Sequence, residues 1–190
     1  MATNTYSTQN DLLLTNLMDF YKNPNYLHRM LKIITGECKI SLRIVDWFTT
    51  NYAKKNFTVY DITNSEGELV KRFKVYCDYK LKLKAYSKKR FDPFCRWDRI
   101  SIPYKDGTSI ETTIGQLNFF KWSLENKVID YIDEYYQIIE NDMNSRNSTS
   151  KRKELGIPDN SKTRKKREEL SVSATKSIKK EKVEIVVQFN

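Results

Sequence analysis

Segment 86–99 holds the densest group of side chains that could bind a charged ligand. Five basic residues alternate there with four aromatic ones: Lys88, Lys89, Arg90, Arg96 and Arg99, with Tyr86, Phe91, Phe94 and Trp97. Cations hold phosphates while exposed rings stack on bases, each stacked base contributing about 1 to 3 kcal/mol. The pattern therefore predicts nucleic-acid contact through Lys88, Lys89, Arg90 and Arg96.

A structural interpretation of the same segment stays open. Residues 91–94, Phe-Asp-Pro-Phe, are typical of a turn, and a turn can bury both rings in the core. Asp92 and Asp98 would then pair locally with Arg96 or Arg99, as exposed charges often do. Under this interpretation the segment folds the chain and binds nothing.

The C-terminal quarter adds two basic clusters, Lys151-Arg152-Lys153 and Arg164-Lys165-Lys166-Arg167. Residues 145–190 contain thirteen Lys and Arg against six Asp and Glu, so they hold +7 of the total net charge of +10. Such clusters serve as phosphate-binding arms, as bipartite nuclear import signals, or only as solubilising charge. We take contact with nucleic acid as the leading interpretation.

Three enzymatic chemistries have weaker support. A zinc site from Cys38, Cys77, Cys95 and His28 would need ligands in close pairs, which these residues do not form. A catalytic triad would depend on His28, the one histidine, which lies among apolar residues of a predicted helix. The five glycines are scattered, so no phosphate-binding loop is indicated.

A magnesium-dependent nuclease is the enzyme alternative that we keep. Asp61, followed by Asp78-Tyr79-Lys80, resembles two acidic residues and a lysine on a hairpin that hold Mg²⁺ and activate water. Asp-x-Lys is a frequent match in a lysine-rich chain. We therefore expect a protein without enzymatic activity, cofactor or bound metal.

Composition indicates one globular domain. The chain has 190 residues, 39% of them hydrophobic and 13% aromatic, which is enough for one packed core. Its mean hydropathy is -0.69 and its apolar runs are too short to cross a bilayer, so no membrane partner is expected. The first residues lack the pattern of a secretory signal, and three widely spaced cysteines predict buried thiols in a reducing compartment.

Hydrophobic periodicity predicts an α+β fold of about five helices and two β-hairpins within residues 10–143, after a flexible N-terminus at residues 1–9. Helices are expected at residues 11–21, 24–36, 41–55, 114–125 and 128–143. The hairpins pair 57–60 with 69–76, and 100–104 with 109–113. Segment 78–86 fits a strand or a helix face equally well.

The composition then changes. Residues 144–182 are rich in Ser, Thr, Asn, Lys and Glu, and they predict a disordered basic linker because they offer little apolar surface to bury. Residues 183–190 alternate apolar and polar side chains, which is typical of a short strand. This strand either returns to the protein's own sheet or adds to a partner's sheet.

Three blocks of sequence carry a resemblance to a known group of proteins. ISLRIVDWFTTNYAKKN (40–56), YKLKLKAYSKKRFDPFCRWDRI (79–100) and ETTIGQLNFFKWSLENKVIDYI (111–132) resemble an uncharacterised protein family of the nucleocytoplasmic large DNA viruses, the giant viruses. The resemblance implies a virus-encoded protein made in the host cytoplasm, at the viral factory, and packaged in the virion. It brings no catalytic or binding residue with it.

We therefore expect a viral protein whose basic tail contacts nucleic acid or an acidic partner such as another virion protein. One alternative is a structural or assembly protein that docks by the strand at 183–190. The other is the nuclease. The sequence leaves the oligomeric state open.

Overall fold

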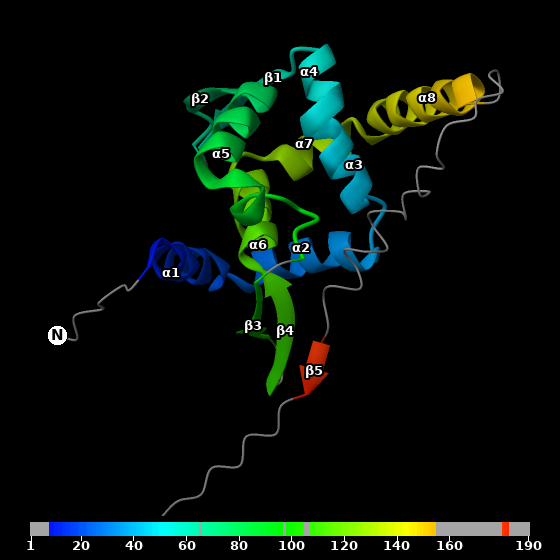
Figure 1. Ribbon diagram of the computed structural model, residues 1–190. Helices are drawn as coiled ribbons and strands as arrows, with labels where there is room; N and C mark the ends of the chain where they lie inside the picture. The colour runs from blue at the N-terminus through cyan, green and yellow to red at the C-terminus, as the bar shows by residue number, and fades with distance from the viewer. Residues whose placement is uncertain (1–7, 65, 97, 105–106, 155–179, 183–190) are drawn as a thin grey trace, which may run out of the picture.

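The computed structural model describes residues 8–64, 66–96, 98–104, 107–154 and 180–182, and its elements confirm an α+β fold (Figure 1). In chain order they are α1 (Gln9–Tyr21), α2 (Pro24–Thr35), α3 (Leu42–Trp47), the π-helix η1 (Phe48–Tyr52), α4 (Ala53–Lys55), β1 (Val59–Thr63), β2 (Leu69–Lys74), α5 (Val75–Arg90), β3 (Arg99–Pro103), β4 (Thr108–Thr113), α6 (Ile114–Glu125), α7 (Val128–Glu134), α8 (Tyr136–Glu154) and β5 (Lys180–Lys182).

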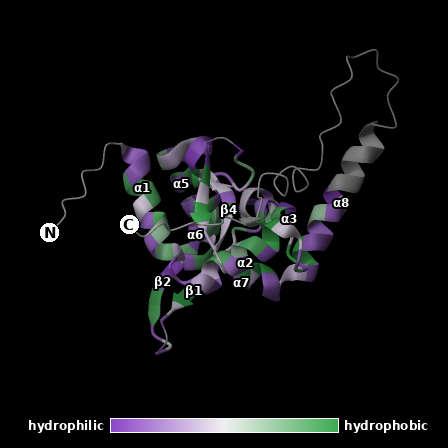
Figure 2. Ribbon diagram, turned by 90° about the horizontal axis from the view of Figure 1, so that it is seen from below, coloured by the Kyte–Doolittle hydropathy of each residue, from purple (hydrophilic) through white to green (hydrophobic). Residues whose placement is uncertain are grey.

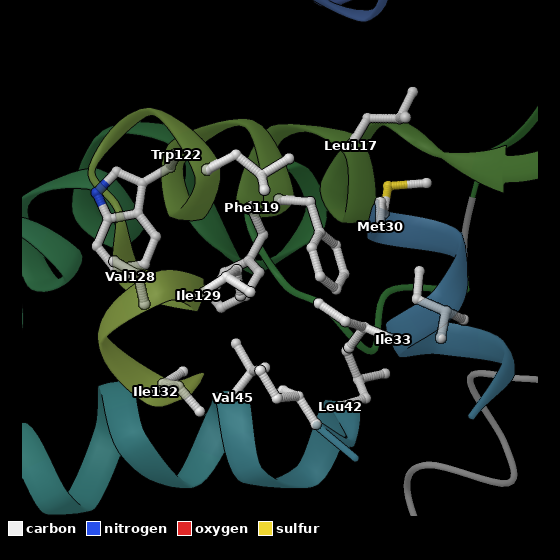
Figure 3. Packing of buried hydrophobic residues seen from close by; sticks show 14 of the residues in the cluster. Met30, Ile33, Leu42, Val45, Leu117, Phe119, Trp122, Val128, Ile129 and Ile132 are labelled. Atoms are coloured by element: carbon white, nitrogen blue, oxygen red, sulfur yellow. The ribbon is translucent and has the colours of Figure 1, made fainter. Parts of the chain in front are cut away.

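Helix α6 lies at the centre of the core. Nearly every one of its residues is buried, and it packs against α1, α2, α5, α7 and β4. A helix buried on nearly all sides must be surrounded by other elements, and its buried polar side chains need partners: Gln116 donates to the Pro93 C=O at 3.2 Å and Asn118 to the Arg90 C=O at 2.9 Å. Figure 3 shows Phe119 of α6 among apolar side chains of α2, α3 and α7. The apolar spacing of residues 114–143 predicts eight core residues, and all are buried except Tyr136, which is only partly covered: Leu117, Phe120, Trp122, Leu124, Ile129, Ile132, Tyr136 and Ile139.

Local sequence signals mark several of the helix ends. Asn23 caps α2 by accepting a hydrogen bond from the Asn25 backbone N–H at 3.0 Å, and Gly36 ends that helix at a left-handed φ of 75°. Ser41 caps α3 by accepting from the Ile44 N–H at 3.3 Å. These caps need only neighbouring residues, so the sequence suffices to predict them.

Both predicted hairpins are present, although the first strand lies at Val59–Thr63 and not at 57–60. Strand β1 pairs with β2, and Figure 2 shows this hairpin projecting from the helical body. Strand β3 pairs with β4, whose other edge takes up β5 with Ile110 opposite Lys180. Lys180–Lys182 was predicted to be linker, but β4 offers free backbone N–H and C=O groups that a passing strand can satisfy. Residues 183–190 lie outside the described residues.

Segment 75–90 is a helix, so the strand predicted to reach Tyr76 stops at Lys74 instead. Val75, Tyr79, Leu83 and Tyr86 recur at helical spacing and pack on the core. Ser87, at φ 62° and ψ 168°, kinks the helix before its last turn. The alternation of Leu81, Leu83 and Ala85 was therefore a misleading strand signal.

Tyr135 divides the predicted last helix into α7 and α8, and α8 continues to Glu154. The predicted start of the disordered linker at residue 144 therefore falls inside a helix. Arg146 pairs with Asp142 one turn earlier at 3.5 Å, and extending an existing helix costs far less than starting one. The cluster Lys151–Lys153 lies on this extension, while Arg164–Arg167 lies outside the described residues.

None of the helices in the described part of the chain has the length and hydrophobicity needed to cross a membrane.

Candidate nucleic-acid interface around helix α5

Helix α5 is the most strongly basic element of the described structure. Six of its sixteen residues are Lys or Arg, and Asp78 is its only acidic residue. Its apolar face packs on α6, so the cations are left on the other sides of the helix. Lys80, Lys84, Lys88 and Lys89 are exposed, whereas Lys82 and Arg90 are half-buried.

Most of these cations have no anionic partner within the described residues. The Lys89 ammonium pairs with Asp98 at 2.9 Å, and Arg90 donates to the Gln9 side chain at 3.2 Å. Among the described residues, no ion pair or hydrogen bond holds the side chains of four lysines: Lys80, Lys82, Lys84 and Lys88. The ammonium groups of Lys80, Lys82 and Lys84 are thus available to an external anion, and that of Lys88 is available in part, because the carboxylates of Asp46 and Asp92 attract it.

A hollow of about 650 Å³, which we call the terminal hollow, lies at the C-terminal end of α5. It is lined by Lys88, Lys89, Asp92, Phe94, Cys95, Arg96 and Asp98. Three of the four binding residues predicted in this segment, Lys88, Lys89 and Arg96, therefore come together. Arg90 turns away toward α1.

The aromatic part of the predicted site is largely internal. Phe91 is 1% exposed and lies against Phe119 and Trp122, so it cannot stack on a base. Phe94 is half-buried at the wall of the terminal hollow, and Trp97 lies outside the described residues. The turn interpretation is thus correct for Phe91, while the cations around it still face the hollow.

The local pairing of the acidic residues differs from expectation. Asp92 accepts a hydrogen bond from the Phe94 backbone N–H at 2.8 Å, which closes the turn. Asp98 pairs with Lys89 rather than with Arg96 or Arg99, and Arg99 pairs with Glu111 on the neighbouring strand at 3.1 Å. The predicted partners are adjacent in sequence, but the kink at Ser87 and the strand pairing of β3 bring other residues closer.

Two carboxyl groups near Lys88 have perturbed pKa values. Burial raises the pKa of Asp46 to about 6, the negative charge of Asp92 adds to the rise, and Lys88 opposes it. Burial likewise raises the pKa of Asp92. Asp46 belongs to α3, far away in sequence, so nothing in segment 86–99 indicates it. These carboxylates offset part of the positive charge of Lys88 at neutral pH.

We expect Asp46→Asn to stabilise the protein at neutral pH. Because the folded-state pKa of Asp46 lies above its unfolded value, the free energy of unfolding falls as pH rises from about 4 to about 6. Asparagine does not ionise, so the variant should be more stable by about 1 to 3 kcal/mol at pH 7 and close to the parent near pH 4. Urea unfolding across this pH range measures the difference. Asp19→Asn, at an exposed carboxyl whose pKa Lys22 lowers, is the control and should show no such gain.

A polar cleft of about 420 Å³ lies on another side of α5. Lys71, Lys82 and Lys121 line it together with Asp78, Glu125 and several asparagines. Most of these groups already bind one another: Lys71 donates to the Asn126 side chain at 2.5 Å, and Lys121 pairs with Glu125 at 3.7 Å. Lys82 is the cation of this cleft that no described residue engages.

The acidic pair that suggested a nuclease is not on one hairpin. Asp78 lies on α5, where its carboxylate accepts a hydrogen bond from the Trp122 indole N–H at 2.6 Å. Asp61 lies on β1 and faces Arg72 at 4.0 Å. Within the described residues, no group of three or more His, Cys, Asp and Glu side chains is placed to hold a metal ion. The expectation that both acids share a hairpin is therefore wrong, because the second strand ends before Asp78.

The cysteines are distributed through the fold. Cys95 is buried and Cys38 half-buried, but Cys77 is exposed on α5, contrary to the expectation of buried thiols. The three form no disulfide.

The fold and site define a small α+β protein with a lysine-rich surface helix. Residues 2–190 match DUF7197, a family of unknown function, and the chain belongs to this family. It is 44% identical over 148 residues to "Uncharacterized protein L507" of Acanthamoeba polyphaga mimivirus, an alignment that covers 75% of this chain and 56% of the relative. The chain thus spans little more than half of that protein's length. No solved structure matches the chain. The resemblance to an uncharacterised giant-virus family is confirmed.

Proposed function

We propose that this protein is a non-enzymatic nucleic-acid-binding protein of a giant virus. The observation that carries the proposal is the set of four lysines on α5 that no described residue pairs, next to the terminal hollow with Lys89 and Arg96. The basic C-terminal clusters would extend the contact beyond the body of the domain. The protein would act in the host cytoplasm and be packaged with the genome, which mass spectrometry of purified particles tests.

The chemistry of the interface favours binding to phosphate over reading of bases. Lysine ammonium groups contact phosphate oxygens, and such contacts position a protein without specifying a sequence. Among the described rings of segment 86–99, Phe91 is enclosed and unavailable for stacking, and Tyr86 and Phe94 are half-buried. We therefore expect binding that depends strongly on salt and weakly on base sequence.

The test compares two triple variants with the same loss of charge. Lys80→Ala, Lys84→Ala and Lys88→Ala remove exposed cations of α5. The matched control changes Lys22, Lys39 and Lys55, each of which pairs with an aspartate elsewhere on the surface. Each phosphate contact contributes about 0.9 to the slope of log affinity against log salt, so the α5 variant should lose up to about 2.7 and the control almost nothing.

Fluorescence anisotropy of a labelled duplex between about 50 and 200 mM salt gives these slopes. Equal slopes for the two variants would contradict binding through α5. Adding Mg²⁺ to the same duplex tests the nuclease alternative. Cleavage by the parent protein that is lost in Asp78→Asn would establish it.

An assembly role is the second candidate. Strand β5 (Lys180–Lys182) pairs with β4 of the protein's own sheet. Docking on a partner's sheet would therefore use residues 183–190. A separate apolar surface beside α5 gives the assembly role more specific support.

A further inference from the structure

The N-terminal half of α5 borders a surface that differs in character from the basic sides of the helix. One hollow, of about 470 Å³, is lined by Ala53, Lys54, Phe57, Thr58, Val59, Lys74, Tyr76 and Cys77. A second, of about 540 Å³, adjoins it through Cys77 and is lined by Cys77, Lys80, Leu81, Leu83 and Lys84. We call the two together the apolar surface.

Large hydrophobic side chains of the apolar surface face the solvent. Phe57 is 85% exposed, Leu81 66% and Val59 39%. Leaving such side chains in water forgoes about 1.5 to 3 kcal/mol for each that could be buried, and contiguous apolar patches on soluble proteins commonly mark interaction sites. The apolar surface is concave as well as hydrophobic, so it can receive a side chain of a partner.

The backbone holds Phe57 in its exposed position. Its φ of 47° lies in the left-handed region, which a bulky residue rarely adopts. The residues on either side are fixed by hydrogen bonds, from Asn56 N–H to Tyr52 C=O at 2.9 Å and from Thr58 N–H to Ala53 C=O at 3.1 Å. Strain of this kind persists only where the surrounding structure imposes it, and it is found preferentially at functional positions.

Cations surround the apolar residues. Lys54, Lys74, Lys80 and Lys84 line the two hollows and are exposed, and none of the lining residues is acidic. The Lys54 ammonium lies 5.7 Å from the centre of the Tyr76 ring, and none of the four lysines forms an ion pair with a described residue. A second copy of this chain would bring the same cations face to face, so like-charge repulsion disfavours self-association here.

We propose that the apolar surface docks an acidic segment of another protein, with one or two large hydrophobic side chains inserted beside Phe57 and its carboxylates on the surrounding lysines. The lining includes the apolar side chains of Ala53, Phe57, Val59 and Leu81, which offer no donor to a base edge or phosphate. This composition favours a hydrophobic anchor over a nucleotide. Lys80 and Lys84 belong to this surface and to the proposed nucleic-acid interface, so the two proposals are separated by testing Phe57, Lys54 and Lys74, which lie outside α5.

Selection of random displayed peptides on the full-length protein tests the chemistry. The enriched peptides should combine aromatic or aliphatic residues with Asp and Glu. One of them, labelled with a fluorophore, should bind the Phe57→Ala variant at least about tenfold more weakly, as hydrophobic hot-spot residues do. Because Phe57 is exposed, this change should leave the fold intact. Ile138→Ala, at an exposed hydrophobic residue on α8, should bind like the parent.

Exchanging the charges of the protein and the peptide tests whether the peptide's carboxylates lie on Lys54 and Lys74. Lys54→Glu with Lys74→Glu should weaken binding, and a peptide whose acidic residues are replaced by lysine should bind this variant better than it binds the parent. The bound acidic peptide should also slow alkylation of Cys77, the one exposed thiol. Enrichment of peptides without acidic residues, or unchanged affinity in the Phe57 variant, would overturn the proposal. The proposal would also be overturned if Phe57→Ala weakened binding to single-stranded DNA or to anionic vesicles and left peptide binding unchanged.

Discussion

Replacing Trp122 with alanine is expected to lower the free energy of unfolding by about 3 to 5 kcal/mol. Trp122 is 3% exposed at the junction of α5, α6 and β2, with four aromatic rings around it: Phe73, Tyr79, Phe91 and Phe119. Alanine would leave a cavity among these rings and leave the Asp78 carboxylate without its indole donor. Equilibrium unfolding in urea measures the loss.

Two further variants separate packing from hydrogen bonding. Trp122→Phe retains a ring but lacks the N–H, so it should cost less than the alanine variant, by an amount that a double-mutant cycle with Asp78→Ala resolves. Trp47 is half-buried and donates its own indole N–H to Asp142 at 3.0 Å, so Trp47→Ala should cost less than Trp122→Ala. A loss below about 1 kcal/mol at Trp122 would mean that α5 does not pack on α6 as described.

Prediction from sequence succeeded for α2 and failed for α5, and the packing of α5 on α6 explains the difference. Helix α2 was predictable because its start and end depend on Asn23, Pro24 and Gly36, all within or next to the helix. Helix α5 was ambiguous because its leucines alternate like those of a strand. Val75, Tyr79 and Leu83 are buried against the core, and this burial favours the helix. The elements that cover these side chains are distant in sequence, so segment 75–90 alone does not indicate them.

In the candidate interface, too, some residues were predicted from sequence and others were missed. Lys88, Lys89 and Arg96 were predicted from a single short segment, and they do share the terminal hollow. Asp46 was missed because it reaches this region only through the packing of α3. Lys80 and Lys84 were missed for a different reason: their cations were visible in the sequence, but their exposure depended on knowing that 75–90 is a helix. Six cations in sixteen residues, with one acid, was the signal that could have found them.

Deletion of residues 155–190 is expected to produce the largest change in nucleic-acid affinity. The deletion removes nine Lys and Arg against five Asp and Glu, while it leaves every described helix in place. If these cations neutralise phosphates, log affinity should fall less steeply with log salt in the truncated protein, because fewer counterions are released. Anisotropy of a labelled duplex over the same salt range as for the α5 variants measures the slope.

The truncation also removes β5 from the edge of β4, so a second variant must keep that strand. Changing Arg164, Lys165, Lys166 and Arg167 to alanine retains the chain length and should reduce the slope by up to about 4, equally for duplexes of different sequence. If the alanine variant binds like the parent but the truncated protein does not, some other part of residues 155–190, strand β5 included, matters and the four cations do not. Equal binding by all three proteins at about 0.15 M salt would assign the contact to residues 1–154, where α5 is the proposed interface, because exposed cations that touch nothing are screened within about 8 Å.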